Sequence, residues 1–253
     1  MVDVLSVATK PLRGVGGFYA MSLDTLVAIP RRPFALREFL LQCWFITRVS
    51  VVPALMLAVP FTVLAAFTLN ALLLDFGAGD AAGTGAAIVM AQIGPVVTVL
   101  VVAGAGATAI CADLGARTIR EELDALRVMG LDPIQTMVVP RVLAACLVAV
   151  LLSAIVSLAT LAGNFGFSVF VQHVTPGAYV AGLTLLTGPT DVLVLLLKAA
   201  VFGLAAGLIG CFKGISVGGG PAGVGNAVNE TVVYSFLALF VINLLVTAGQ
   251  FGV

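Results

Sequence analysis

The sequence predicts an all-α integral membrane protein in which five helices cross the bilayer. The composition is the first observation: 61% of the 253 residues are hydrophobic, 9% are charged, and the mean hydropathy is +1.19. A soluble domain carries about a quarter charged residues, so this chain is suited to lipid. The second observation is a set of five long stretches almost free of charge, and the third is the gathering of basic residues between alternate stretches. We expect a single domain, 1–253.

The segment before the first charge-free stretch, 1–48, is expected to be an N-terminal segment at the membrane surface. Helices are predicted over 17–29 and 34–48, separated by the Pro-Arg-Arg-Pro run at 30–33. In 34–48 the apolar and polar side chains fall on opposite faces, which is typical of an amphipathic helix lying in the interface. The alternative is that 34–48 only extends the first span. The apolar face holds Leu36, Phe39, Leu40 and Cys43, and the polar face holds Arg37, Glu38 and Gln42.

The five charge-poor stretches are each long enough to cross a bilayer, for which a helix needs about 20 residues. Pro53 and Pro60 in the first can kink it, because neighbouring helices in a bundle satisfy the freed backbone groups. All of the stretches lack formal charge except the fourth, which contains Lys198. The predicted spans are 49–74, 86–112, 142–165, 192–212 and 231–249.

The distribution of charge predicts the orientation of these spans. Eleven of the 12 Lys and Arg residues lie in 1–48, 113–141 and 213–230, which five spans place on one side. The loops on the opposite side contain acidic residues and no basic ones. Because basic loops stay in the cytoplasm, we expect a cytoplasmic N-terminus and an external C-terminus.

The charged segment 113–141 is expected to contain a short helix over 118–129. Ile119, Leu123 and Leu126 are spaced as one apolar stripe, at i, i+4 and i+7. Gly130 is suited to a C-terminal cap, and Pro133 follows it. Because a helix this short is marginal alone in water, its stripe needs something to dock into. The acidic residues Glu121, Glu122 and Asp124 occupy its early turns and other side.

The letters around this helix resemble the coupling-loop signature of the MlaE/YrbE lipid-transport permeases. The matching runs are Glu-Glu-Leu-Asp-Ala-Leu at 121–126 and Met-Gly-Leu-Asp-Pro at 129–133. Weaker matches follow the family's order, among them Ile-Gly-Pro-Val-Val at 93–97, Asp-Leu-Gly at 113–115 and Thr-Val-Val-Tyr-Ser at 231–235. The resemblance covers nearly the whole chain. Abundant Ala, Gly, Val and Arg residues suggest a GC-rich genome, which favours the actinobacterial YrbE branch of Mce systems.

The resemblance implies a permease domain of five spans and an N-terminal interface helix in a bacterial inner (plasma) membrane. It implies pairing with a second permease, identical or paralogous, two copies of an ABC ATPase, and MCE-domain proteins that carry lipid. ATP and Mg would be bound by the ATPase, because no GxxxxGK[ST] sequence occurs in this chain, which is expected to hold no cofactor. The implied ATPase-coupling residues are Ile119, Glu121, Glu122, Leu123, Asp124, Leu126, Met129, Gly130 and Pro133.

The sequence also departs from the family pattern within the spans. Ala91 and Gln92 stand where members have Arg-Glu, and Ala105 replaces another arginine. This loss of charge favours a less polar cargo or polar contacts supplied by the partner permease. Gln92 and Lys198 are candidates for an intramembrane polar contact or for contact with cargo.

Lys198 is the one formal charge well inside a predicted span, and such residues are functional candidates by default. Its stem could snorkel outward, it could pair with Asp191 through water, or it could contact a cargo carboxylate.

Gly104, Gly203 and Gly207 are expected to let helices approach closely.

Other readings of the sequence are weaker. The four cysteines are scattered singly and predict neither a disulfide framework nor a metal site. A net charge of +0 offers no field for nucleic acid. An intramembrane hydrolase would use Asp80 or His173, but both fall in predicted loops. A scaffold that anchors MCE proteins without transport is the other rival.

Overall fold

The computed structural model describes residues 2–32, 34–77, 96–186 and 188–250. Within them, five helices are long and apolar enough to cross a membrane, which confirms the predicted fold class. The shortest has 24 residues, and at 1.5 Å per residue this exceeds the bilayer core. The five helical stretches are Leu36–Leu73, Val96–Ile119, Ile134–Phe170, Pro189–Ile215 and Gly220–Gly249.

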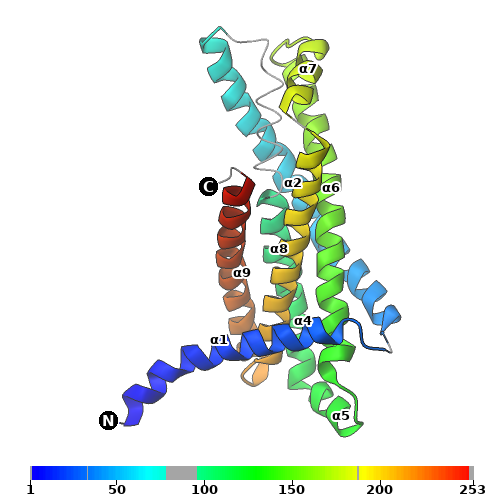
Figure 1. Ribbon diagram of the computed structural model, residues 1–253, viewed down its shortest axis with the longest axis vertical. Coiled ribbons are helices and arrows are strands. Elements are labelled where there is room, and N and C mark those ends of the chain that lie inside the picture. Colours follow the sequence, from blue (N-terminus) through cyan, green and yellow to red (C-terminus); the bar gives the residue numbers. More distant parts are fainter. Residues whose placement is uncertain (1, 33, 78–95, 187, 251–253) are drawn as a thin grey trace.

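The helix that lies across the bundle is α1 (Val2–Ala28), near the end that carries α5 (Figure 1). Met21 and Ala28 are buried, whereas Tyr19 and Leu23 are more than 60% exposed. Phe18 packs edge-to-face on Phe212 of α8, with ring centroids 5.6 Å apart. α1 is thus an amphipathic helix that docks on the bundle with one face and leaves apolar side chains on another.

The segment 34–48 does not form a separate interface helix. It belongs to α2 (Leu36–Asp75), a continuous helix of 40 residues with Pro53 and Pro60 inside it. The structure therefore favours the alternative in which 34–48 extends the first span. The physical reason is that one face of this extension is held by the bundle: Ile46 is fully buried, and Glu38 contacts Arg141 of α6.

The helices also continue past the predicted span limits into the charged segment 113–141. α4 (Thr108–Ile119) prolongs the second span beyond residue 112, after a π-helical stretch, η2 (Val102–Ala107). α6 (Val139–Phe170) follows directly on a second one, η3 (Ile134–Val138), so the third span begins before residue 142. Only α5 (Glu122–Val128) and its flanks remain between them.

The outer connection 166–190 is likewise mostly helical. α6 extends to Phe170, and α7 (Pro176–Leu186) packs against it. His173 lies exposed between the two with a positive φ of 57°.

The central helix is α8 (Pro189–Ile215), which packs against α4, α6 and α9 (Gly220–Gln250). Glycines let it approach them closely: a Cβ on Gly203 would lie 2.7 Å from the Ala145 carbonyl oxygen, and one on Gly207 3.2 Å from the Val142 Cα. At Gly104 a Cβ would meet nothing nearer than 3.9 Å within this chain, so a close approach at Gly104 stays a prediction.

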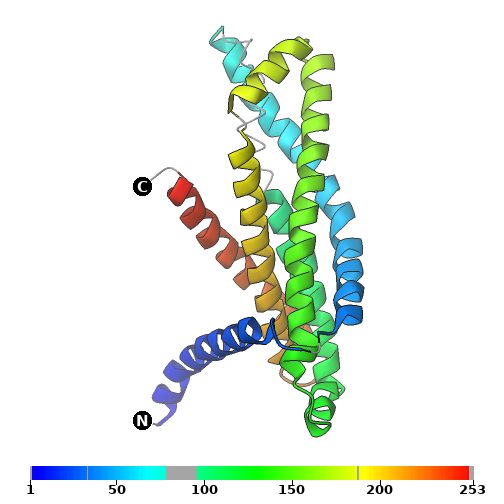
Figure 2. The ribbon, with the colours of Figure 1, turned by 45° about the vertical axis from the view of Figure 1, so that its right-hand side comes forward.

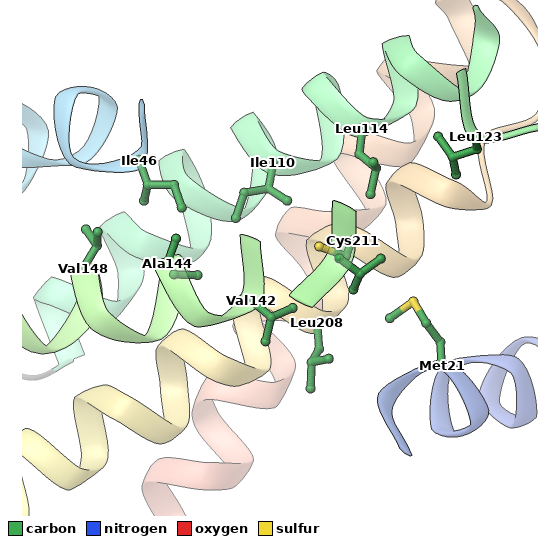
Figure 3. Close-up of a cluster of buried hydrophobic side chains, with 12 residues drawn as sticks. Met21, Ile46, Ile110, Leu114, Leu123, Val142, Ala144, Val148, Leu208 and Cys211 are labelled. Carbon is green, nitrogen blue, oxygen red and sulfur yellow. The ribbon is translucent and has the colours of Figure 1, made fainter. Parts of the chain in front are cut away.

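A core cluster of buried side chains joins α1, α2, α4, α5, α6 and α8 at one end of the bundle (Figure 3). α9 is less enclosed, since only 11% of its most apolar window is buried. Figure 2 shows α9 leaning away from α8 toward its C-terminal end.

Candidate functional site

The short helix α5 is set off from α4 by a sharp change of backbone direction. α4 ends at Ile119, and Glu121 adopts a left-handed conformation with a φ of 59°. A non-glycine residue in this region is uncommon and marks a specific turn. At the other end, Gly130 has a φ of 76°, and its N–H donates to the Arg127 carbonyl at 3.0 Å. The C-terminal end at Gly130 is therefore as the sequence indicates.

The break at Glu121 divides the predicted apolar stripe. Ile119 belongs to α4 and is 37% exposed, whereas Leu123 and Leu126 belong to α5. Leu123 is 5% exposed and lies at one end of the core cluster (Figure 3). The prediction of one continuous stripe is wrong, because Leu123 docks into this chain's own core.

A different set of apolar side chains is exposed at this end. Val128 is 88% exposed, Met129 65% and Leu131 49%. They occupy the last residue of α5 and the turn after it, before Pro133, which is buried. We call Val128, Met129 and Leu131 the apolar tip. Of these, the sequence analysis singled out Met129 alone; the signal for the others was an apolar residue on either side of the Met129–Gly130 cap.

The acidic residues of α5 divide between solvent and the bundle. Asp124 accepts a hydrogen bond from exposed Arg127 at 2.8 Å. Glu122 instead lies 3.1 Å from Arg120 and 3.7 Å from Arg117 of α4. Glu122 thereby links α5 electrostatically to α4.

A cluster of four charged residues joins α2, α4 and α6 beneath α5. Arg141 of α6 is fully buried, and its Nη2 lies 2.6 Å from Asp113 Oδ2 and 3.1 Å from Glu38 Oε1. Its Nη1 donates to the Met137 carbonyl at 2.8 Å. Arg117 completes the cluster, 3.4 Å from Asp113 and 4.0 Å from Glu38. We call Glu38, Asp113, Arg117 and Arg141 the ion cluster.

The ion cluster was missed as a site by the sequence analysis. Asp113 and Arg141 are 28 residues apart, and the four members lie on three helices, so spacing does not reveal the cluster. The signal that the sequence did offer was the position of Arg141, directly before the apolar start of the third predicted span. Because two carboxylates and two guanidiniums balance, the cluster holds three helix ends together without a net charge.

Lys198 of α8 is, with Arg141, the second buried cation among the described side chains. Its side chain is 3% exposed, and Nζ donates to Thr247 Oγ1 of α9 at 3.2 Å. No ion pair joins it to Asp191, whose Oδ2 accepts the Gly188 N–H at 2.8 Å and caps the start of α8. Lys198 lines an open cavity of ≈ 400 Å³ between α8 and α9, whose other described walls are Val194, Leu197, Val201, Val246 and Gly249.

The remaining candidates are not brought together with these sites. Gln92 and Asp80 lie outside the described residues. His173 is exposed beyond the end of α6. Within the described segments, no group of three His, Cys, Asp or Glu side chains is placed to hold a metal.

Comparison with known proteins places this architecture in a family. The family described as Permease MlaE matches residues 39–248. A probable ABC transporter permease protein of Rickettsia conorii is 29% identical over 96% of this chain and 95% of its own length. A probable ABC transporter permease protein of Synechocystis is 35% identical over 60% of this chain. The protein TRIGALACTOSYLDIACYLGLYCEROL 1, chloroplastic, of Arabidopsis thaliana is 31% identical over 63% of it. The chain covers 58% and 46% of the lengths of these last two relatives.

Proposed function

Because the chain belongs to the MlaE permease family, we propose that it is the transmembrane permease subunit of an ATP-driven lipid transporter. A separate ABC ATPase would bind ATP and Mg and hydrolyse the nucleotide. Lipid would pass to or from MCE-domain proteins on the opposite face of a bacterial inner membrane. The relatives named as probable ABC transporter permeases support the ATPase partner, and the Arabidopsis relative is named after a diacylglycerol lipid.

The observation that carries this proposal is the apolar tip. Val128, Met129 and Leu131 expose apolar surface at the end of the bundle that carries the basic residues, which the positive-inside rule assigns to the cytoplasm. An apolar surface on a short, charged element outside the spans is typical of a protein contact. We propose that the tip enters a groove on the ATPase, with Glu121 and Asp124 at its rim. Leu123, which is buried in the core cluster, holds α5 against the bundle instead.

The ion cluster supplies a path from this contact to the spans. Glu122 joins α5 to Arg117, and Arg117 belongs to the same charged group as Arg141 and Glu38. We propose that closure of the ATPase dimer shifts α5 and that these contacts move α2, α4 and α6 together. Movement of these helices would open or collapse a hydrophobic space between two permeases.

Two further partners fit the least covered helices. α9 exposes a row of apolar side chains, including Leu237, Phe240 and Leu244, and α2 exposes Trp44 near its start. We propose that α9 contributes to contact with the second permease. The 37–48 part of α2 would contact the membrane helix of an MCE protein.

The test is co-purification of the ATPase from the native host with the wild-type chain and with Val128→Glu/Met129→Glu. Two carboxylates are costly to bury in an apolar groove, so we expect the ATPase to be lost from the variant. Phe170→Glu/Val171→Glu is the matched control, because these residues are 79% and 56% exposed at the opposite end of α6. The control should retain the ATPase. Loss of ATPase from neither variant would contradict coupling through the tip.

A lipid-transport assay on the same variant separates the transporter from a scaffold that only anchors MCE proteins. A scaffold predicts that lipid transport and MCE association persist in Val128→Glu/Met129→Glu. The transporter predicts that MCE proteins remain bound while transport stops. Absence of an ATPase from the wild-type preparation would make the scaffold the better account.

A further inference from the structure

We infer that the α8–α9 cavity around Lys198 binds an amphiphile with one hydrocarbon chain and a single negative charge, of the alkyl carboxylate class. The inference rests on the proposed lipid transport, because it identifies the cargo class that the permease would hold. The ammonium of Lys198, which is 3% exposed, faces a cavity whose other described walls are apolar.

The positive charge of Lys198 is not balanced by a carboxylate among the described residues. An ammonium removed from water needs an anion or several hydrogen-bond acceptors to offset its lost hydration. Lys198 is 3% exposed, and the bond that it donates to Thr247 at 3.2 Å goes to a neutral hydroxyl. No carboxylate in the described segments forms an ion pair with it. Asp191, the nearest acidic residue in sequence, is engaged in capping α8. The cation therefore suits an anion brought by a ligand.

The second step concerns the number of charges and chains. Val194, Leu197, Val201 and Val246 offer no hydrogen bonds from their side chains, so among the described lining residues Lys198 is the one whose side chain can bind the polar part of a ligand. One ammonium balances one negative charge. The cavity volume of ≈ 400 Å³ is near the lower end of ligand sites, which run from about 300 to 1,000 Å³. It suits part of one acyl chain better than a two-chain phospholipid.

The third step concerns position. Lys198 lies nine residues into α8, about 13 Å along the helix from Pro189, at the end opposite α5. The cavity is lined by α8 and by Val246 and Gly249 near the C-terminal end of α9, and it is open, so a hydrocarbon chain can enter it. A carboxylate on Lys198 and a chain along the apolar wall of α8 would satisfy both surfaces.

The experiment uses the purified full-length chain in detergent micelles and a photoactivatable palmitate, with mass spectrometry to locate the labelled residues. We expect labelling on α8 and α9 that unlabelled palmitate displaces and hexadecanol does not. Lys198→Met should weaken displacement by about 10- to 100-fold, the range for loss of one charge-assisted contact. Lys198→Arg should retain it. Lys213→Met is the matched control, since Lys213 is also on α8 but pairs with Glu230 at 2.6 Å.

Two further measurements keep the inference open to refutation. Val201→Trp keeps the cation and fills the cavity, so it should abolish labelling in a chain that elutes as the wild type does. Dioleoyl phosphatidylglycerol, with one charge and two chains, should compete poorly. Equal labelling of Lys198→Met and wild type, or equal competition by hexadecanol or the phospholipid, would overturn the assignment. None of these measurements needs an ATPase. A failure to bind palmitate would therefore not contradict ATPase binding by the apolar tip, and a failure to bind the ATPase would not contradict palmitate binding.

Discussion

Two buried cations in the described part of the chain, Arg141 and Lys198, show opposite ways of placing charge in an apolar protein. Arg141 is fully enclosed and touches two carboxylates, whereas Lys198 is 3% exposed and donates to one hydroxyl. The first is satisfied within the chain and ties helices together. The second is satisfied only in part and lies on a cavity. A buried charge with its partners supplied indicates structure and coupling, while one without them indicates a ligand.

The largest effect should follow Arg141→Met. Loss of the buried guanidinium leaves Asp113 and Glu38 with Arg117 alone, at the longer distances of 3.4 and 4.0 Å, and removal of one partner from a buried pair costs about 3–5 kcal/mol. We expect the free energy of unfolding to fall by that amount. It can be measured by titrating the purified chain from dodecyl maltoside into sodium dodecyl sulfate and following circular dichroism.

Arg120→Met is the control for this variant. Arg120 also pairs with a carboxylate, Glu122, at 3.1 Å, but its side chain is 64% exposed. Exposed pairs contribute about 0–1 kcal/mol, so this substitution should have little effect. Equal losses for the two variants would show that burial of Arg141 is not what makes its pairs important.

The next largest effect should follow Gly203→Ala. This variant tests the face of α8 that packs closely on α6, in contrast to the face that borders the cavity beside α9. The added Cβ would lie 2.6 Å from Ala149 Cβ and 2.7 Å from the Ala145 carbonyl oxygen. Overpacking of this kind costs about 1–3 kcal/mol and separates α8 from α6. Gly104→Ala, with its nearest contact at 3.9 Å, should instead gain up to about 1 kcal/mol from helix propensity. A destabilised Gly104→Ala would show that this glycine has a packing role after all.

A smaller effect is expected from Glu38→Gln. Arg141 keeps its 2.6 Å contact with Asp113, and Glu38 is 26% exposed, so about 1 kcal/mol should be lost. Asp124→Asn, whose side chain is 68% exposed, should change stability by no more than about 0.5 kcal/mol. If coupling runs through the ion cluster, Glu38→Gln should also reduce ATPase-driven transport more than Asp124→Asn. Equal transport in the two would contradict that route.

The five spans could be predicted from the sequence because the information is local. A charge-free run of about 20 residues forms a helix in lipid whatever its neighbours are. The residues at which the helices begin and end could not be predicted from the sequence, because they depend on contacts between distant residues. The third span begins at Ile134 rather than 142 since Arg141 is buried by carboxylates from α2 and α4. A charge that seems to end a span on sequence grounds is here part of its core.

The candidate sites were predictable to different degrees for the same reason. Lys198 stood out because a formal charge inside an apolar run is visible in the sequence. The prediction of one stripe through Ile119, Leu123 and Leu126 was wrong because Glu121 adopts a positive φ and separates two helices. A positive φ is uncommon for a residue other than glycine, so the sequence did not indicate this break. The exposed tip at Val128 could not be found from periodicity, since burial of Leu123 turns α5 onto its own chain.

The smallest effect on stability, and the sharpest contrast with Arg141→Met, is expected for Lys198→Met. The methionine replaces an ammonium with an apolar group of similar length and leaves behind only the Thr247 hydroxyl, which can bond to its own helix. We expect the free energy of unfolding without ligand to be unchanged or about 1 kcal/mol higher, measured by the same titration. Saturating palmitate should then stabilise the wild type and not the variant, because only binding to the folded state raises stability. A loss as large as that of Arg141→Met would mean that Lys198 is already paired within the chain, and the contrast between the two cations would disappear.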